Sequence, residues 1–205
     1  MKTVLLQQTE LEKAALLLRN GKIVAFPTET VFGMGVIYDN HSALQTLKSV
    51  KGRDEQKPFT LIVSTTHEIN DYAMITEEAK VVINKYMPGP LTVILPAKSV
   101  LIGPITNNSS YIGIRVSSDE HVTNLIKTVG KPLLVPSANK SGTLPLLNSA
   151  DVYKVFNGEI SAVIAGTAGG SKASTVIKID DKIELVREGD IPFNDLKQTY
   201  EGAKK

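Results

Sequence analysis

A repeated pattern in the sequence constrains the fold of this chain most. In it, a short apolar run stops at a proline and small polar residues follow. Residues 23–26 (Ile-Val-Ala-Phe) are bounded by Gly21 and Pro27, which is typical of a short buried strand. Residues 28–30 (Thr-Glu-Thr) come next, and residues 133–135 show the same pattern before the small polar loop at 137–142. Because α/β proteins commonly bind ligands where strands end, both loops are candidate walls of a site.

Further apolar runs alternate with segments whose apolar residues recur at helical spacing. The strands predicted in this way are 23–26, 59–63, 91–95, 112–116, 133–135, 162–165, 174–179 and 183–186. The predicted helices are 9–20, 42–50, 76–86, 118–128 and 149–156, with one short helix and a frayed basic end after Pro192. This alternation, with a hairpin turned by residues 180–181, predicts an α/β fold in which helices cover a mixed sheet.

The size and composition of the chain favour one domain over residues 1–205, because 205 residues with 42% hydrophobic content can bury one sizeable core. No apolar run approaches the roughly 18 residues of a membrane helix, and the first residues lack the apolar core of a signal peptide. The absence of cysteine excludes disulfides and thiolate metal sites and is compatible with a cytoplasmic location. The three scattered histidines, His41, His67 and His121, predict no metal site.

Two cations stand two residues apart at Lys51 and Arg53, on either side of Gly52. On a strand or extended loop both side chains would point to one side, and an anion between them would relieve their repulsion. This spacing predicts one wall of a site for a phosphate-bearing ligand, and a solvated loop is the alternative that spacing alone leaves open. With Lys48 and Lys57 they form a local basic cluster, although a net charge of +2 is small for a strong nucleic-acid binder.

Three further features do not identify a functional site by themselves. Residues 166–174 are rich in glycine but fail as a P-loop, since Ala173 stands where a magnesium-binding Ser or Thr is required. Gly33 and Gly35 form no dinucleotide fingerprint, because Tyr38 occupies the place of the third glycine. Arg115 lies inside a predicted strand, where a cation must reach water or face an anion.

Taken together, several separated motifs occur in one order along the chain: FPTETVFGMG, KGR, MPGPLTVIL, IGIRV, PLLVPSANKSG, ASTVI and VREG. In this combination the chain resembles the YrdC family, also called TsaC, over about residues 21–189. The resemblance implies a twisted α/β sheet surrounded by helices, with a deep, positively lined cavity. Because the chain ends soon after VREG, it resembles the short form without an extra C-terminal domain, and residues 190–205 are expected to be a short tail.

The activity that the resemblance implies is that of a nucleotidyltransferase, a threonylcarbamoyl-AMP synthase. Such enzymes combine L-threonine, bicarbonate (or CO2) and ATP into threonylcarbamoyl-adenylate and pyrophosphate, and a partner enzyme transfers the threonylcarbamoyl group to an adenosine of tRNA. The carbamate attacks the α-phosphorus of ATP, which requires positioning and charge stabilisation more than a protein nucleophile. Magnesium is expected to arrive on the ATP phosphates, and no tightly bound prosthetic group is expected.

The same resemblance assigns individual positions. Lys51 and Arg53 are expected to hold the ATP phosphates as the catalytic cations and to carry no core packing. The other nucleotide-binding positions it implies are Lys57, Tyr111, Asn139 and Arg187. The threonine-binding positions are Thr30, Arg115, Ser137 and Ser174, with Arg115 as the partner of the substrate carboxylate because its planar fork binds bidentately.

Some positions depart from the family pattern. Ser64 stands where many members carry His, residues 144–147 (Leu-Pro-Leu-Leu) replace Ser-Pro-Thr, and Ala173 replaces a Glu or Pro. Two alternative functions follow from the same resemblance: an RNA-binding module of this fold without synthase activity, and a carbamoyl-transferring relative that uses carbamoyl phosphate. The basic cluster at 48–57 supports the first, but low net charge and few aromatic residues weigh against it, and the second normally requires additional domains.

Overall fold

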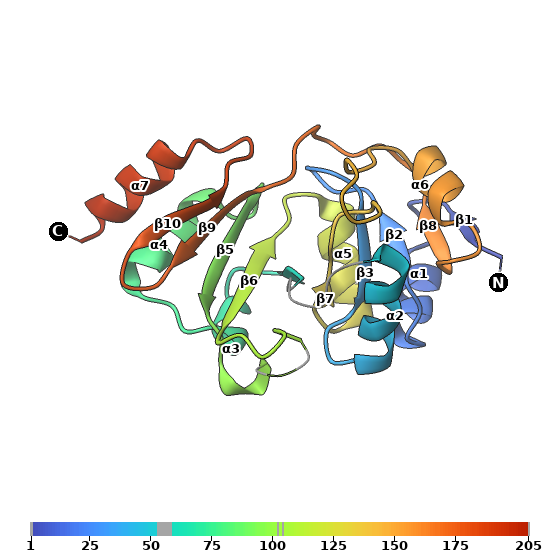
Figure 1. Ribbon diagram of the computed structural model, residues 1–205, viewed down its shortest axis with the longest axis horizontal. Coiled ribbons are helices and arrows are strands. Elements are labelled where there is room, and N and C mark those ends of the chain that lie inside the picture. The colour runs from blue at the N-terminus through green and yellow to red at the C-terminus, as the bar shows by residue number, and fades with distance from the viewer. Residues whose placement is uncertain (1, 53–58, 102, 104, 205) are drawn as a thin grey trace.

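The structure is a computed structural model that describes residues 2–52, 59–101, 103 and 105–204. Its centre is a ten-stranded sheet with the order β1-β8-β2-β3-β7-β4-β6-β5-β9-β10. The N-terminal strand lies at one end of the molecule and the C-terminal helix at the other (Figure 1). None of the helices in the described part of the chain combines the length and the hydrophobicity that a membrane span requires.

The strands are short, as the interrupting prolines and glycines require. They are β1 (Val4–Leu6), β2 (Val24–Phe26), β3 (Gly33–Ile37), β4 (Leu61–Val63), β5 (Leu91–Pro96), β6 (Tyr111–Val116), β7 (Leu133–Leu134), β8 (Ala162–Ile164), β9 (Thr175–Ile179) and β10 (Ile183–Arg187). The helices are α1 (Leu11–Arg19), α2 (His41–Lys51), α3 (Ile69–Tyr72), α4 (Glu77–Tyr86), α5 (Glu120–Val129), α6 (Ser149–Phe156) and α7 (Phe193–Gly202), with a 3₁₀ turn at Ser99–Leu101.

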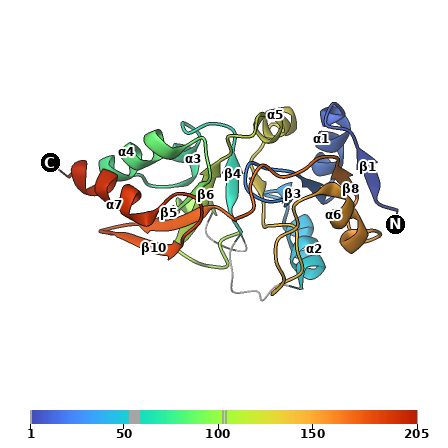
Figure 2. The same ribbon diagram turned by 90° about the horizontal axis from the view of Figure 1, so that it is seen from above.

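The sheet is mixed, which confirms the α/β prediction. β4 pairs in parallel with β6, and β5 pairs in parallel with β9. The pair β2–β3 and the predicted hairpin β9–β10 are antiparallel. Helices cover both faces: α1 and α5 lie on the opposite side of the sheet from α2 and α6 (Figure 2).

Two hydrophobic clusters hold these layers together. One joins α1 and α5 to the face of the sheet that carries Val24, Ile62 and Val135. The other packs α2, α4, α6 and α7 against the alternate residues of the same strands, such as Ala25 and Leu61. This division follows from the two-residue period of a strand, in which successive side chains point to opposite faces.

Several elements differ from the sequence-based predictions. The strands β1 and β3 and the short helix α3 were not predicted. The short helix predicted after Pro192 is present as α7, and it is packed more firmly than expected. There Leu196 is fully buried and Tyr200 is nearly so, and Tyr86 of α4 donates a hydrogen bond to the Asp195 carbonyl. The tail therefore contributes to the main core.

The glycines of β3 explain why this strand escaped prediction, since strands are normally depleted of glycine. A Cβ atom on Gly33 would lie 2.6 Å from Val135 Cγ1, and one on Gly35 would lie 2.9 Å from Phe26 Cε1. Both glycines therefore allow neighbouring side chains to pack directly over the backbone of β3. Neither forms a nucleotide-binding turn.

The burial of Leu196 predicts that shortening this one side chain of α7 lowers the stability of the protein considerably. Leu196→Ala should lower the free energy of unfolding by about 2–5 kcal/mol, the range for a buried leucine that leaves a cavity. Chemical denaturation measures this value. Leu16→Ala in α1 is the matched control, because Leu16 is a 55% exposed helical leucine, and a similar loss in both variants would contradict the packing of α7.

Candidate functional site

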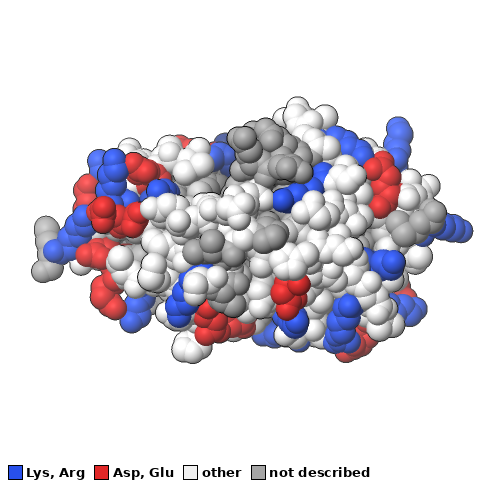
Figure 3. All heavy atoms as spheres, turned by 60° about the horizontal axis from the view of Figure 1, so that its bottom comes forward, with Lys and Arg blue, Asp and Glu red and all other residues white. Residues whose placement is uncertain are grey.

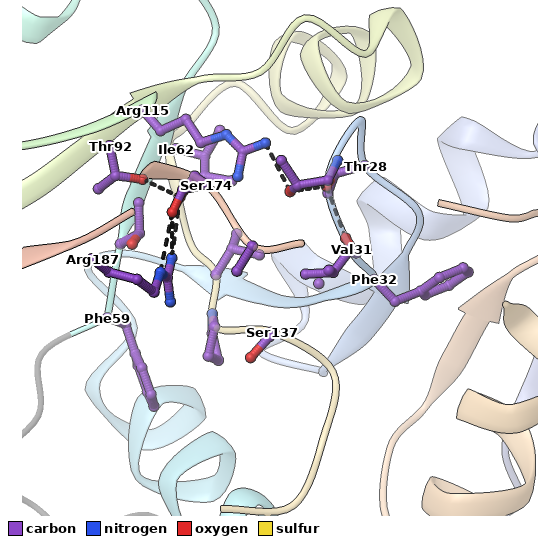
Figure 4. A pocket seen from close by; sticks show the side chains of 16 residues that line it. Thr28, Val31, Phe32, Phe59, Ile62, Thr92, Arg115, Ser137, Ser174 and Arg187 are labelled. Carbon is purple, nitrogen blue, oxygen red and sulfur yellow. Dashed lines mark hydrogen bonds between the residues drawn. The ribbon is translucent and has the colours of Figure 1, made fainter. Parts of the chain in front are cut away.

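A cavity of about 140 Å³ lies on the same face of the sheet as α1 and α5, beside the part of that face that they cover. Its walls come from the residues around β4 to β7, from the loop after β2 and from the start of β9 and end of β10. Figure 4 shows Ser174 and Arg187 on one side of the cavity, Thr28 on the other and Ser137 at a third point. Segments far apart in the sequence therefore meet at this one place.

The loop after β2 is a tight turn fixed by its own hydroxyl groups. Thr28 Oγ1 donates to the Val31 carbonyl at 2.8 Å and accepts from the Thr30 backbone N–H at 3.1 Å. The two threonine hydroxyls lie 2.9 Å apart. Since the Thr28 proton is used by Val31, the Thr30 hydroxyl donates to Thr28 and is free to accept from elsewhere.

Arg115 donates the hydrogen bond that the Thr30 hydroxyl accepts. It projects from β6 into the cavity wall, where it is only 6% exposed, and its NH2 donates to Thr30 Oγ1 at 2.9 Å. The same nitrogen lies 2.8 Å from Glu29 Oε1. Among the described residues, Arg115 Nε is buried without a hydrogen-bond partner. The guanidinium thus keeps an unused donor after it has bound the turn.

Glu29 is the anion that balances this buried cation. Burial by itself would raise the pKa of Glu29, but the Arg115 charge and hydrogen bonds from Ser117, Arg115 and Ser118 outweigh burial and lower it. The Ser117 hydroxyl and the Ser118 backbone N–H donate to the two carboxylate oxygens. Glu29 therefore ties the turn after β2 to the junction between β6 and α5.

Arg187 brings a second guanidinium to the cavity from the end of β10. The register of β10 shifts between Leu185 and Arg187, and such a bulge re-aims a side chain. Nε and NH2 of Arg187 donate to the Ser174 carbonyl at 3.1 and 2.9 Å. Burial, and then the charge of Arg115, lower the pKa of Arg187. The two arginines therefore repel each other across the cavity.

Five of the predicted site residues meet in the cavity, namely Thr30, Arg115, Ser137, Ser174 and Arg187. Two others lie behind its wall: Asn139 contacts Ser137, and Lys51 contacts both. Tyr111 does not line this cavity, because its hydroxyl donates to Asp180 and its ring lies under Lys178. Arg53 and Lys57 lie outside the described residues.

Two expectations about Lys51 are wrong. It is the last residue of α2, and Gly52 adopts the left-handed conformation of a helix C-cap, so Lys51 does not stand on an extended loop. Its side chain is 3% exposed and donates to the Ser137 carbonyl at 2.6 Å. Lys51 therefore carries packing and hydrogen bonds of its own.

Sequence reasoning missed the roles of Glu29 and Ser117. Arg115 could have indicated a carboxylate partner, because a cation inside a strand requires an anion. Glu29 was a candidate for that partner, since it stands in the motif FPTETVFGMG. Which carboxylate would meet Arg115 depended on tertiary structure. The glycine-rich loop also has a structural explanation: Gly169 and Gly170 donate to the carbonyls of Thr28 and Thr30 at 2.9 and 3.1 Å.

The departures from the family pattern can now be placed. Ala173 lines the cavity, whereas Ser64 does not and instead binds the Glu68 carboxylate. In the segment that replaces Ser-Pro-Thr, Leu144 is 86% exposed and Leu146 packs against the core. Only the alanine therefore changes the surface of the cavity itself.

Chemically, the cavity combines two guanidinium groups, one carboxylate behind them and several hydroxyls. That arrangement suits a small anion with additional polar groups. In the described ranges, no group of three or more His, Asp or Glu side chains is placed to hold a metal ion.

A sequence profile of the Sua5/YciO/YrdC family, described as "Telomere recombination", matches residues 16–189. The chain belongs to this family.

Relatives of this family support the assignment over nearly the whole chain. A "Putative threonylcarbamoyl-AMP synthase" of Methanocaldococcus jannaschii is 38% identical over 179 residues, covering 86% of this chain and 84% of the relative. A "Threonylcarbamoyl-AMP synthase" of Pyrococcus abyssi is 30% identical over 94% of this chain and 58% of its own length. A crystal structure of P. abyssi Sua5 complexed with L-threonine superimposes with a TM-score of 0.90 at 29% identity, covering 97% and 61% of the two chains. The chain thus spans about three fifths of the P. abyssi protein.

The buried pair of Glu29 and Arg115 predicts a pH-dependent stability. Since the folded-state pKa of Glu29 lies below its ordinary value of 4.5, the ionised carboxylate stabilises the fold above that value. This contribution is lost as pH falls through the lowered folded-state pKa. Glu29→Gln should cost about 3 kcal/mol at neutral pH, because it leaves a buried cation unpaired, and the difference from wild type should shrink with acidification.

Denaturant unfolding of both proteins along a pH series measures this difference. Glu159→Gln is the matched control, since its pair with Lys140 is partly exposed and should change stability little. A Glu29→Gln deficit that stays constant down to the most acidic conditions would show that the charge of Glu29 is unimportant.

Proposed function

We propose that this chain is an L-threonylcarbamoyladenylate synthase, which converts L-threonine, bicarbonate and ATP into threonylcarbamoyl-AMP and pyrophosphate. The observation that carries the proposal is the meeting of Thr30, Arg115, Ser137, Ser174 and Arg187 in one small cavity. Its volume of about 140 Å³ is below the roughly 300–1,000 Å³ of pockets for drug-sized ligands, which suits an amino acid. The names of the family members compared above support the same reaction.

In this proposal Arg115 binds the threonine carboxylate. Its NH2 is held by Glu29 and Thr30, and this fixes the guanidinium in the wall of the cavity that it lines. A substrate carboxylate would also relieve the repulsion between Arg115 and Arg187. The hydroxyls of Ser137 and Ser174 offer further hydrogen bonds to the amino acid.

The nucleotide is proposed to extend from this cavity toward further cations. Arg187 and the loop at 137–139 lie on its near side, and Arg53, Lys57 and Tyr111 are the proposed contacts beyond. The threonine amine and bicarbonate form a carbamate with loss of water. A carbamate oxygen then attacks the α-phosphorus of ATP and pyrophosphate leaves, carrying the magnesium that arrived with ATP.

The product is an activated acyl-adenylate, so we further propose a tRNA-modifying transferase as the partner that consumes it. The chain is proposed to act as one domain over residues 1–205 and in the cytoplasm. On the face shown in Figure 3, the basic and acidic side chains of the described residues are interspersed and do not gather into one basic patch. That distribution favours the enzyme over a dedicated RNA-binding module, which would need a larger basic surface.

A pyrophosphate-release assay tests the proposed reaction. Release should require ATP, bicarbonate and L-threonine together, and L-threonine should be preferred over L-serine by about 10- to 200-fold in kcat/KM. That is the range that one methyl group supplies in an apolar pocket. Release that does not depend on the amino acid, or equal use of both amino acids, would contradict the proposal.

Arg115→Lys tests the carboxylate contact separately. Lysine keeps the charge that pairs with Glu29 but loses the planar fork. Loss of hydrogen bonds to a charged group is worth about 1.5–3 kcal/mol, or roughly 10- to 150-fold, so KM for threonine should rise by that factor with little change in KM for ATP. Arg19→Lys is the control, because Arg19 does not line the cavity and instead donates to the Thr128 and Val129 carbonyls at the end of α5. A rise confined to KM for ATP would place Arg115 on the nucleotide side instead.

A further inference from the structure

The ammonium group of Lys51 organises the loop that carries Ser137. Lys51 Nζ lies 2.6 Å from the Ser137 carbonyl, 3.0 Å from the Asn139 carbonyl and 3.1 Å from Asn139 Oδ1. All three acceptors belong to residues 137–139, the small polar segment that follows β7. The last residue of α2 thus contacts the back of the cavity wall.

These contacts fix the orientation of the Asn139 amide. A lysine ammonium is a donor without any acceptor, so the amide must turn its oxygen toward Lys51. The opposite side of the amide agrees with this orientation, because Nδ2 faces two acceptors, the carbonyls of Lys140 at 3.1 Å and Thr143 at 2.6 Å. A flipped amide would place donor against donor on one side and acceptor against acceptor on the other.

The amide in turn fixes the proton of Ser137. Ser137 Oγ lies 2.6 Å from the same Asn139 Oδ1. Because that oxygen can only accept, the Ser137 hydroxyl must donate its single proton to it. Ser137 lines the cavity, so its hydroxyl oxygen offers only lone pairs to a ligand there.

We propose that Lys51 is a positioning residue which, through Asn139, presents Ser137 as a hydrogen-bond acceptor to the amino-acid substrate. The substrate group that fits is an N–H or O–H donor, and L-threonine carries both. This inference rests on the proposed function. It differs from the role implied by the resemblance, in which Lys51 acts on the ATP phosphates, because it predicts that Lys51 influences threonine binding when no nucleotide is present.

The loop keeps other anchors on α2 when the Lys51 ammonium is removed. The Ser141 backbone N–H donates to the Lys51 carbonyl at 2.9 Å, and Lys140 Nζ donates to the Val50 carbonyl at 2.8 Å. Removal of the Lys51 ammonium should therefore disturb the direction of the Ser137 proton more than the position of the loop.

The test is a double-mutant cycle on L-threonine binding by calorimetry in the absence of nucleotide. The proteins are wild type, Lys51→Met, Ser137→Ala and the double variant. Each single substitution should weaken binding by about tenfold, the value of one hydrogen bond of roughly 1.4 kcal/mol. The double variant should be no weaker than either single variant, because both act on the same contact.

Lys140→Met is the matched control. It removes another lysine that joins the same loop to α2, without touching Ser137 or the Asn139 amide oxygen, and should bind threonine like wild type. If Lys51→Met is too unstable to measure, Asn139→Ala replaces it in the cycle with the same expectation.

Wild-type affinity for threonine in Lys51→Met, or losses that add in the double variant, would overturn the inference. The same would be true of a Lys140→Met variant that loses as much affinity as Lys51→Met. Failure of the wild-type protein to bind threonine at all would instead contradict the proposed function, so the two failures are distinguishable.

Discussion

The burial of Arg115 within the central sheet is the interaction on which the site depends. A guanidinium taken out of water is costly unless charge and hydrogen bonds compensate for it. Here the compensation comes from Glu29 and Thr30, which lie on a turn far away in the sequence. The same carboxylate accepts from the start of the segment leading to α5. One buried cation thus explains why the turn after β2, the end of β6 and the approach to α5 adopt a single arrangement.

Among the described residues, three cations surround or support the cavity, and each is held by its own set of acceptors. Arg115 is held by a carboxylate, Arg187 by the Ser174 carbonyl, and Lys51 by carbonyl and amide oxygens of residues 137–139. Carbonyls orient a cation without cancelling its charge, so Arg187 keeps its full attraction for an arriving anion. Holding these groups before binding lowers the entropy cost of association, which is the general benefit of preorganisation.

How far the sequence predicts this structure depends on whether the decisive interaction is local. Strands that end at prolines, the helix at 149–156 and the hairpin at 180–181 follow from local rules and are present. β3 did not follow from them, because its glycines are explained only by Phe26 and Val135, which pack over its backbone. The cavity positions came from a family resemblance covering several motifs, whereas the partner of Arg115 and the acceptors of Lys51 required the tertiary structure.

The charge of the cavity also bears on how the two proposed substrates would bind. Arg115 and Arg187 contribute two positive charges to the described part of the cavity, Lys51 adds a third behind its wall, and Glu29 contributes one negative charge, which leaves a net charge of +2. These cations are sufficient to bind one carboxylate, such as that of the proposed amino-acid substrate. A triphosphate carries several negative charges and needs additional cations in an environment of low dielectric. The chain offers them in the basic cluster at 48–57, where Arg53 and Lys57 are the residues the resemblance assigns to ATP. Binding of the two proposed substrates should therefore depend on different cations, with Arg187 common to both.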